Sequence, residues 1–375
     1  MTSVCQTLLA PPAEIEGLYP LSPTAAETVH RGRSHSVKIL RKEEGRLALL
    51  IGPCSIHDPE EALEYGKRLA ELQGKVASSF FLIMRVFVEK PRTRLGWKGM
   101  LYDPYLDGSN DLQEGVHRSR KLLLELNELG VPCATEFLEP LVAPYLSDLI
   151  AWGIIGARTG ASQPHRQLVS GLPFPVGFKN GVHGDLDTPI SSILAARIPH
   201  SHFGIDRDGR IASVQTTGNP LAHLILRGSA QGPNCEPASV QEALRFLREH
   251  HLEEKLLIDC SHGNSGKDFQ RQKWAFETAL KQKNPAIRGL MLESNLRAGK
   301  QPLNEPRPKG RGMIWEEFET PPKFGCELPG PKGPGFRRPD EEPDQLQYGI
   351  SITDPCLNWE ETEDLILRAR QWIKR

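Results

Sequence analysis

Short apolar runs recur along this chain and alternate with segments whose apolar residues are spaced as on one face of a helix. Each run is only four to seven residues long, and each is apolar at consecutive positions. This pattern is typical of parallel strands that helices cover on the outside. The eight runs are Leu47–Ile51, Phe80–Val86, Val131–Glu136, Ile154–Arg158, Pro175–Lys179, His223–Arg227, Leu256–Asp259 and Gly289–Glu293.

Amphipathic segments lie between the runs. One of them ends before Gly130, a residue suited to the position after a helix C-terminus. The last, from Trp359 to Ile373, follows the eighth run. Alternating strands and helices favour a parallel sheet, and eight such units predict a closed (β/α)8 barrel of the α/β class. A doubly wound open sheet is the alternative that periodicity leaves open.

Two segments do not fit the repeat. Residues 1–46 precede the first run, and we expect them to form an N-terminal arm outside a barrel of residues 47–375. Residues 303–347, an insert in the loop after strand eight, are rich in Pro, Gly and charge. Because they contain few clustered apolar residues to offset the entropy of ordering, we expect most of the insert to be disordered. The sequence DRDGR at 206–210 predicts a β-hairpin turn.

Every predicted strand closes with a polar or ionisable residue, either at the end of its apolar run or just beyond it. A single charge after a strand is often only the start of a solvated loop. In an α/β barrel, however, the C-terminal ends of all strands converge on one cavity, so eight such residues in succession predict a polar site there. They are Cys54, Arg85, Glu136, Arg158, Lys179, Arg227, His262 and Glu293.

Part of this set has the character of metal ligands. Cys54, His262 and Glu293, together with the later Asp354, offer a thiolate, an imidazole and two carboxylates. Such ligands suit Mn2+, Fe2+, Co2+ or Zn2+ better than Mg2+ or Ca2+. Taken alone, Cys54 could equally be a buried structural thiol and His262 a hydrogen-bonding histidine. Asp259 could be a core carboxylate or a support for the site.

The remaining residues are mostly cations. Arg85, Arg158, Lys179 and Arg227 are joined by Lys90 and Arg92, just after the second run. The whole chain has a formal net charge of −1, so this positive charge is local. Small substrates with phosphate and carboxylate groups would balance it. We see no basic face with interleaved aromatics, which argues against a nucleic-acid partner.

The cysteines and the apolar runs indicate a compartment. The 7 cysteines form no CxxC pair, which suggests a reducing environment. No apolar run approaches the roughly 18 residues of a membrane span. The N-terminus also lacks the basic segment of a secretory signal. We therefore expect a cytoplasmic protein with no membrane partner.

Longer motifs resemble those of one enzyme family. They are GPCSIHD (52–58), MRVFVEKPRTRLGWKG (84–99), EF (136–137), GARTGASQPHR (156–166), PVGFKNG (175–181), LILRG (224–228), DCSHGNS (259–265), MLESNL (291–296) and YGISITDPC (348–356). In order and spacing they resemble type I 3-deoxy-D-arabino-heptulosonate-7-phosphate (DAHP) synthases, which open the shikimate pathway to the aromatic amino acids. The likeness extends from about residue 20 to the end, apart from 303–347.

The resemblance implies a transferase that condenses phosphoenolpyruvate with D-erythrose 4-phosphate and water, giving DAHP and phosphate. It implies that one divalent metal ion is bound by Cys54, His262, Glu293 and Asp354. It assigns phosphoenolpyruvate to Arg85, Lys90, Arg158, Lys179 and Arg227, and erythrose 4-phosphate to Arg92 and Thr93. Its catalytic residues would be Lys90, which protonates the new alkoxide, Glu136, near the phosphoenolpyruvate carboxylate or a water, and His262.

The resemblance also implies a homo-oligomer, a dimer or a tetramer, with an aromatic amino acid as feedback inhibitor. Pro173 departs from the family, since many relatives have a small polar residue there, near the inhibitor region. The sequence TGAS after Arg158 and the long insert depart from it too. Three alternatives stay open: a sibling 3-deoxy-octulosonate-8-phosphate synthase using arabinose 5-phosphate, a class II aldolase, and a non-catalytic paralogue if the insert disrupts Asp354. The KPRT motif argues against the sibling, which has an Asn there. A class II aldolase prefers histidine-rich metal ligands, and His262 is the one histidine among the candidate ligands here.

Overall fold

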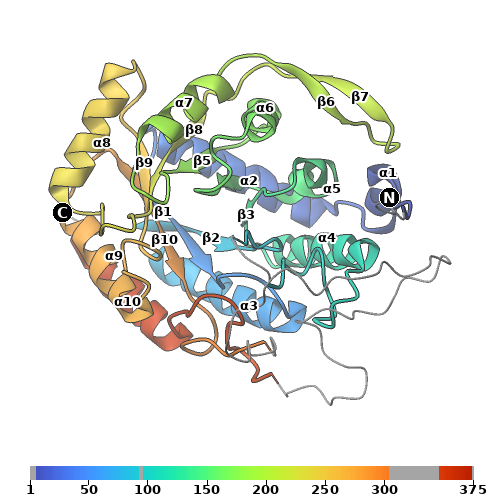
Figure 1. Cartoon of the computed structure of the whole chain (residues 1–375). Helices are drawn as coiled ribbons and strands as arrows, with labels where there is room; N and C mark the ends of the chain where they lie inside the picture. The colour runs from blue at the N-terminus through green and yellow to red at the C-terminus, as the bar shows by residue number, and fades with distance from the viewer. Residues whose placement is uncertain (1–5, 93–95, 304–345, 374–375) are drawn as a thin grey trace, which may run out of the picture.

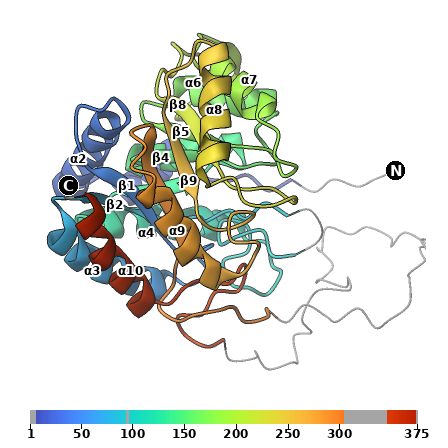
Figure 2. The same cartoon turned by 90° about the vertical axis from the view of Figure 1, so that its left-hand side faces the viewer.

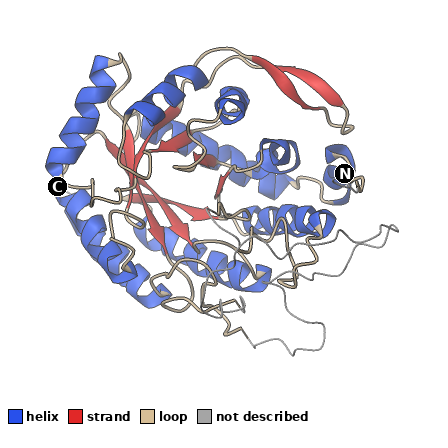
Figure 3. Ribbon diagram, in the orientation of Figure 1, coloured by secondary structure: helices blue, strands red, loops and turns tan. Residues whose placement is uncertain are grey.

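Eight parallel strands close into a barrel with helices around the outside (Figures 1 and 3). This computed structural model describes residues 6–92, 96–303 and 346–373. Around the barrel the strands follow the order β1-β10-β9-β8-β5-β4-β3-β2, so the predicted closed barrel is confirmed and the open sheet is not. The barrel strands are β1 (Leu47–Gly52), β2 (Phe80–Arg85), β3 (Cys133–Glu136), β4 (Trp152–Ile155), β5 (Val176–Lys179), β8 (Ala222–Leu226), β9 (Leu256–Asp259) and β10 (Ile287–Glu293).

The helices of the described residues begin with two in the N-terminal segment and continue between the strands. They are α1 (Pro12–Leu18), α2 (Pro23–Leu40), α3 (Pro59–Val76), α4 (Leu112–Glu128), α5 (Ala143–Leu146), α6 (Gln163–Gly171), α7 (Asp187–Ala196), α8 (Pro237–Glu249), α9 (Gln272–Lys281) and α10 (Trp359–Ile373). Local sequence sets several of their ends. For example, α3 begins after Asp58, whose carboxylate accepts from two backbone N–H groups, and α4 ends before Gly130 with φ 79°.

The fourth strand begins and ends earlier than its apolar run predicts. It spans Trp152–Ile155, whereas the run extends to Arg158. The chain turns away at Gly156, where a Cβ atom would lie 2.2 Å from Oε1 of Glu136. An added Cβ would displace the Glu136 carboxylate, so glycine at this position keeps that side chain in place. Arg158 therefore lies in the turn beyond the strand and not in the strand itself.

Alternating residues of the strands build two separate cores, as the twofold period of a strand requires. Leu49, Ile51 and Leu82 belong to the larger core, which includes the apolar faces of the surrounding helices. The smaller core occupies the barrel interior. Its buried members are Ile39, Leu40, Ala48, Leu50, Phe81, Ile83, Phe87, Ala134, Trp152, Ile154, Ile225, Leu257 and Met291.

The N-terminal segment takes part in this interior core. Ile39 and Leu40, at the end of α2, pack with the interior residues of the strands. The helix also lies close against the barrel (Figure 2), because Gly32 leaves no room for a Cβ beside Pro132 and Ala151. The Nε and Nη2 atoms of Arg33 donate to backbone carbonyls of Ile150 and Ser147, at 2.9 and 2.7 Å. The arm and the barrel are therefore packed as one body.

A β-hairpin of strands β6 (Ser201–Ile205) and β7 (Ile211–Gln215) projects from the barrel (Figure 1), and its turn is the predicted 206–210. The hairpin contacts α1, where Ala13 N donates to Arg207 O at 2.8 Å. Its outer face exposes two large apolar side chains, since Phe203 is 90 % exposed and Ile211 83 % exposed.

The two ends of the predicted insert lie side by side. Residues 304–345 lie outside the described residues. On either side of them, the Gln301 side chain bonds the backbone N and O of Gln347 at 2.7 and 2.9 Å. A further bridge joins Lys300 to Ser351 and leads the chain towards Asp354. In the part of the chain that the structure describes, no helix combines the length and the apolar character that a membrane span requires.

Candidate active site

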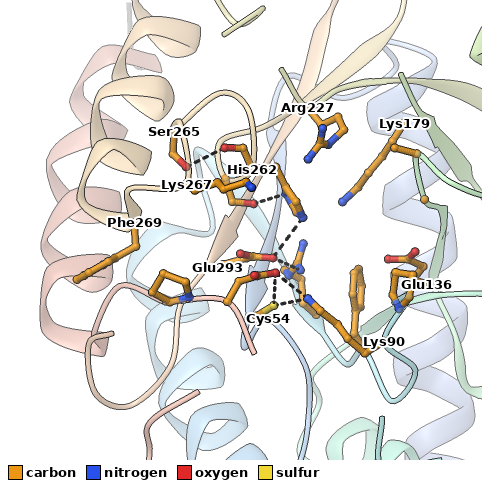
Figure 4. A pocket seen from close by; sticks show the side chains of 18 of the residues that line it. Cys54, Lys90, Glu136, Lys179, Arg227, His262, Ser265, Lys267, Phe269 and Glu293 are labelled. Carbon is orange, nitrogen blue, oxygen red and sulfur yellow. Dashed lines mark hydrogen bonds and ion pairs between the residues drawn. The ribbon is translucent and has the colours of Figure 1, made fainter. Parts of the chain in front are cut away.

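A cavity of about 540 Å³ opens at the C-terminal ends of the strands (Figure 4). The structure brings every predicted site residue to this cavity except Thr93, which lies outside the described residues. They come from the ends of all eight barrel strands and the loops beyond them, as the barrel geometry requires. The predicted residues that line it are Cys54, Arg85, Lys90, Arg92, Glu136, Arg158, Lys179, Arg227, His262, Glu293 and Asp354.

Three of the four predicted metal ligands form a tight cluster. Cys54 Sγ and one carboxylate oxygen each of Glu293 and Asp354 lie within 4.8 Å of one another. The fourth, His262, points its Nε2 towards them and lies 3.9 Å from Glu293 Oε1. His262 has a left-handed backbone with φ 56°, an unfavourable conformation of the kind found at functional sites.

The segment that carries Asp354 is held against the loop after β1. Ser55 and Thr353 share a buried hydrogen bond of 2.7 Å between their hydroxyl groups, which keeps Asp354 beside Cys54. Further along the segment, Gly349 donates its N–H to the carboxylate of Glu61 on α3. Burial raises the pKa of Glu61 to about 7. The loop after β1 and the segment before α10, which are distant in sequence, are thus joined next to the proposed metal ligands.

Lys90 lies within this acidic cluster. Its Nζ donates to Cys54 Sγ at 2.7 Å and to Asp354 Oδ2 at 2.9 Å. Burial opposes its charge, but Cys54 and Asp354 raise the pKa of Lys90 above its usual range. Burial, with the nearby charge of Glu293, raises the pKa of the Cys54 thiol to about 12. A thiolate therefore forms here only when a cation stabilises it.

The donor set fits a divalent transition metal. Cys54 and Glu293 are buried, and several acidic groups at this separation need a compensating cation. Sulfur, imidazole nitrogen and carboxylate oxygen together match the ions predicted from the sequence. The site also has supporting contacts of the type found around metals, because the Gln272 side chain bonds both the N–H and the C=O of Glu293, at 2.8 and 3.0 Å.

Arg85 has the features of an anion-binding residue. It is 1 % exposed, and its Nη2 donates to Glu293 Oε1 at 3.1 Å. Its Nε and Nη1 find no hydrogen-bond partner among the described residues. Because a buried guanidinium with free donors is costly, an anionic ligand in this cavity would complete its contacts.

Lys179 and Arg227 lie near each other in the cavity, and Arg158 also lines it (Figure 4). Burial lowers the pKa of Arg227, and the positive charge of Arg158 adds to this effect. Lys179 Nζ lies 2.8 Å from Oδ2 of Asp259, which is fully buried. Cations in such proximity favour the binding of a multiply charged anion.

Glu136 is the acidic residue on the side of the cavity that faces Lys179. It is 6 % exposed, and its Oε1 has no hydrogen-bond partner in the ranges that the structure describes. The loop around Lys90 is fixed to the loop after Glu136 by Glu89, which accepts hydrogen bonds of 3.1 Å from Leu138 N and Glu139 N. An unpartnered carboxylate oxygen of this kind can accept a proton or bind a water.

Several residues of the cavity were not predicted from the sequence. They lie beyond the strand ends, in loops and at the start of α9, where position in the repeat gives no signal. Lys267 has a left-handed backbone with φ 66°, and the exposed Lys300 belongs to the bridge beside Ser351. The most notable of these residues are Ser265, Lys267, Phe269, Gln272 and Lys300. The two lysines add to the positive charge of the cavity.

Comparison with known proteins gives a consistent result. The model of the DAHP synthetase I family matches residues 23–328. The chain is 40 % identical to a Tyr-sensitive phospho-2-dehydro-3-deoxyheptonate aldolase of Escherichia coli, over 98 % of this chain and 93 % of that protein. It is 41 % identical to the Trp-sensitive enzyme of the same organism, over 96 % and 93 %. A solved structure of the phospho-2-dehydro-3-deoxyheptonate aldolase from Francisella tularensis superposes with a TM-score of 0.87 and 36 % identity, covering 100 % of both chains.

Proposed function

Because this chain belongs to the DAHP synthetase I family, we infer that it condenses phosphoenolpyruvate with D-erythrose 4-phosphate and water. The products are DAHP and inorganic phosphate, in the first step of the shikimate pathway. The relatives' names favour this reaction over that of the sibling synthase. The observation that carries the proposal is the single cavity that collects all the described residues predicted for the reaction.

The proposed metal ligands are Cys54, His262, Glu293 and Asp354, for one ion of Mn2+, Fe2+, Co2+ or Zn2+. Their support is the 4.8 Å cluster and the orientation of His262 Nε2. When bound, the ion would supply Lewis-acid polarisation of the aldehyde carbonyl. Lys90 then has two roles: its ammonium neutralises the acidic cluster, and it lies beside the place where the aldehyde oxygen becomes an alkoxide.

Phosphoenolpyruvate is assigned to the cationic part of the cavity. Arg85 has two free donors for its carboxylate or phosphate, and Arg158, Lys179 and Arg227 supply further positive charge. Arg92 and Thr93 are assigned to the phosphate of the aldose. Arg92 Nε donates to Trp97 O at 2.7 Å, which fixes the direction of the guanidinium.

The chemical steps follow from these positions. Carbon 3 of phosphoenolpyruvate forms a bond to carbon 1 of the aldose, and Lys90 donates a proton to the oxygen of that carbon. Positive character then develops at carbon 2, where water adds and loses a proton. The unpartnered Oε1 of Glu136 can accept that proton. The bond between carbon 2 and the phosphate oxygen breaks last, as the new hydroxyl group on carbon 2 gives its proton to the departing phosphate, which releases inorganic phosphate and leaves the keto acid.

We further propose that the barrel of residues 47–375 is catalytic and that the arm of residues 1–46 supports a homo-oligomer, a dimer or a tetramer. The exposed Phe203 and Ile211 of the hairpin support assembly, because large apolar side chains on one face favour contact with a second protein surface. Two relatives are named for sensitivity to Tyr and Trp, and we propose an aromatic amino acid as inhibitor here too. A cytoplasmic location fits these roles.

One assay tests the function directly. Phosphate release from phosphoenolpyruvate is measured with erythrose 4-phosphate, with arabinose 5-phosphate, and without an aldose. Of these three conditions, we expect phosphate release only with erythrose 4-phosphate. EDTA should abolish this release and Mn2+ should restore it. Equal rates with arabinose 5-phosphate would favour the activity of the sibling synthase. No release with either sugar would contradict the proposed function.

A further inference from the structure

Asp259, at the end of β9, contacts residues of both the cationic part and the proposed metal-binding part of the active site. The side chain is 0 % exposed and does not line the cavity itself. Its Oδ2 lies 2.8 Å from Lys179 Nζ and 3.0 Å from His262 Nδ1. Its Oδ1 accepts hydrogen bonds from Ser261 N and Ser261 Oγ, at 3.1 and 2.6 Å. One carboxylate thus joins a proposed phosphate-binding lysine to a proposed metal ligand.

The protons around Asp259 determine the state of His262. An ionised carboxylate can only accept, so the hydroxyl proton of Ser261 points to Asp259 Oδ1. The Ser261 oxygen then presents only lone pairs to His262 Nδ1, which is 2.7 Å away. Because both neighbours of Nδ1 are acceptors, Nδ1 carries a hydrogen, and the neutral ring keeps its lone pair on Nε2. That is the nitrogen that faces Glu293.

Asp259 also fixes the second partner, Lys179. Lys179 is 4 % exposed, and among the described residues Asp259 is the carboxylate that forms an ion pair with it. The same oxygen, Oδ2, lies within ion-pair distance of both Lys179 and His262, but neither contact has hydrogen-bond geometry. The hydrogen-bonded connection from Asp259 to His262 passes through the Ser261 hydroxyl. When a phosphate binds Lys179, it draws that ammonium away from Oδ2. The charge of Asp259 then acts more fully on its contacts with Ser261 and His262, which hold the His262 ring with Nε2 towards the other proposed ligands.

We propose that Asp259 is a positioning residue that couples anion binding at Lys179 to metal binding through His262. This inference rests on the proposed function of the site, because it needs a metal at Nε2 and a phosphate at Lys179. By linkage, an anion on Lys179 tightens metal binding, and the metal tightens anion binding by the same factor. A buried ion pair that only stabilised the fold would produce no such coupling.

The test is a set of Mn2+ titrations on the full chain, with and without inorganic phosphate as the anion. In the wild-type protein we expect phosphate to tighten Mn2+ binding several-fold. In Asp259→Asn, Mn2+ should bind about 10–100-fold more weakly, as is found when supporting contacts of metal ligands are removed. The effect of phosphate on that affinity should fall to less than twofold.

Two further variants separate the roles. Ser261→Ala keeps the pair of Asp259 and Lys179 but removes the hydroxyl beside His262 Nδ1, so Mn2+ affinity should fall while phosphate affinity stays. Asp148→Asn is the matched control, because Asp148 pairs with the buried Arg120 at 2.8 Å, away from the site. It should leave both affinities unchanged. If Asp259→Asn does not fold, the Ser261→Ala pattern decides the question.

The outcomes distinguish the two proposals. If wild-type protein binds no Mn2+, the proposed metal site fails. If wild-type protein binds Mn2+ and Asp259→Asn binds it equally well with phosphate coupling intact, only the role of Asp259 fails. Unchanged Mn2+ affinity in Ser261→Ala would likewise contradict the proton arrangement argued for His262.

Discussion

The two ends of the barrel interior are built from the same strands and have opposite chemistry. On β2, Phe81 and Ile83 belong to the apolar interior core, and Arg85, the next residue on that face, lines the cavity. On β10, Met291 is apolar, and Glu293 two residues later is a proposed ligand. Along these strands, the step from one interior-facing residue to the next thus leads from the packed core to the charged site.

Both ends contain buried polar atoms without a partner among the described residues, but the atoms differ in kind. In the apolar part these are the neutral Trp152 Nε1 and His223 Nε2, which contact each other's rings edge to face at 5.2 Å. At the cavity they belong to Arg85 and Glu136. An unpaired charge costs far more than an unpaired neutral group. The cavity therefore needs ligands to be satisfied, whereas the apolar end does not.

The largest effect should come from removing a ligand at the charged end. Cys54→Ala should lower turnover by about a thousandfold or more, since it removes a donor from the proposed metal site, whose ion would polarise the aldehyde. Metal content after dialysis, turnover and circular dichroism measure the effect. Cys133→Ala is the control, since Cys133 is equally buried but lies in the outer core. Full activity of Cys54→Ala in the presence of EDTA would contradict the metal site.

A substitution in the apolar interior, two residues before Arg85 on β2, should instead affect stability and leave substrate binding unchanged. Ile83 is 0 % exposed in the interior core, and Ile83→Ala should reduce the free energy of unfolding by about 2–4 kcal/mol through the lost contacts and the cavity left behind. The Michaelis constants should stay within about twofold. Denaturant unfolding and steady-state kinetics check both statements. A large change in either Michaelis constant at unchanged stability would show that the two ends are not separable.

A change at the rim of the cavity should separate the two substrates. Arg92→Ala should raise the Michaelis constant for erythrose 4-phosphate tens-fold, because charge-assisted hydrogen bonds contribute about 1.5–3 kcal/mol. The constant for phosphoenolpyruvate should change little. Arg85→Ala serves as the matched comparison and should affect phosphoenolpyruvate instead. If both constants rose together in Arg92→Ala, Arg92 would belong to a shared subsite.

The apolar end should show its character in the pH dependence of stability. Burial lowers the pKa of His223 to about 3, although a hydrogen bond to Leu221 O opposes this. A lowered pKa means that the unfolded chain binds the proton more readily, so stability is lost as the pH falls from about 6.5 towards 3. Between pH 7 and pH 5 this single group should remove about 1.5–2 kcal/mol.

His223→Gln tests this expectation, because glutamine has a similar volume and can still donate to Leu221 O but does not titrate. The difference in unfolding free energy between the variant and the wild type should favour the variant increasingly as the pH falls. His30→Gln, at an exposed position on α2, is the control and should show no such trend. Parallel pH profiles of His223→Gln and wild type would mean that protonated His223 finds a partner in the folded state.

Much of this comparison could be read from the sequence. All eight strands were predicted, because each is a short run that is apolar on both faces, and the polar residue that closes each run, or lies just beyond it, lines the cavity. The interior core was less accessible to prediction. That Ile39 and Leu40 of the arm pack with the strand interior depends on the docking of α2, which no local pattern encodes.

The parts of the site that could not be predicted from the sequence also depend on tertiary contacts. Gln272, at the start of α9, fixes the backbone of Glu293, and Lys267 lies in a left-handed turn. Both positions depend on the folded path of the chain after β9. Asp259 can be located in the sequence as part of the DCSHGNS motif. Its contact with Lys179, which joins β9 to β5, is seen only in the folded structure. Composition and spacing specify which residues reach the cavity, and tertiary contacts specify which of them touch.

The smallest effect is expected where the charged end meets the predicted insert. The described chain on either side is already joined, since Gln301 bonds Gln347 through both backbone groups and Gln301 N donates to Ser351 O at 2.8 Å. Asp354 is therefore delivered to the site by contacts outside 304–345. Replacing 304–345 with a short Gly/Ser linker should leave Mn2+ affinity intact and turnover within a few-fold, because the cost of loop closure changes by only about 0.6 kcal/mol per doubling of length. Gln301→Ala in the shortened chain is the informative partner, since it removes the side-chain bonds to Gln347 and Ile350 and should weaken Mn2+ binding through Asp354. A collapse of turnover in the shortened chain with Mn2+ still bound would show instead that the insert excludes water during the reaction, and the charged end of the barrel would then extend beyond the residues that line the cavity.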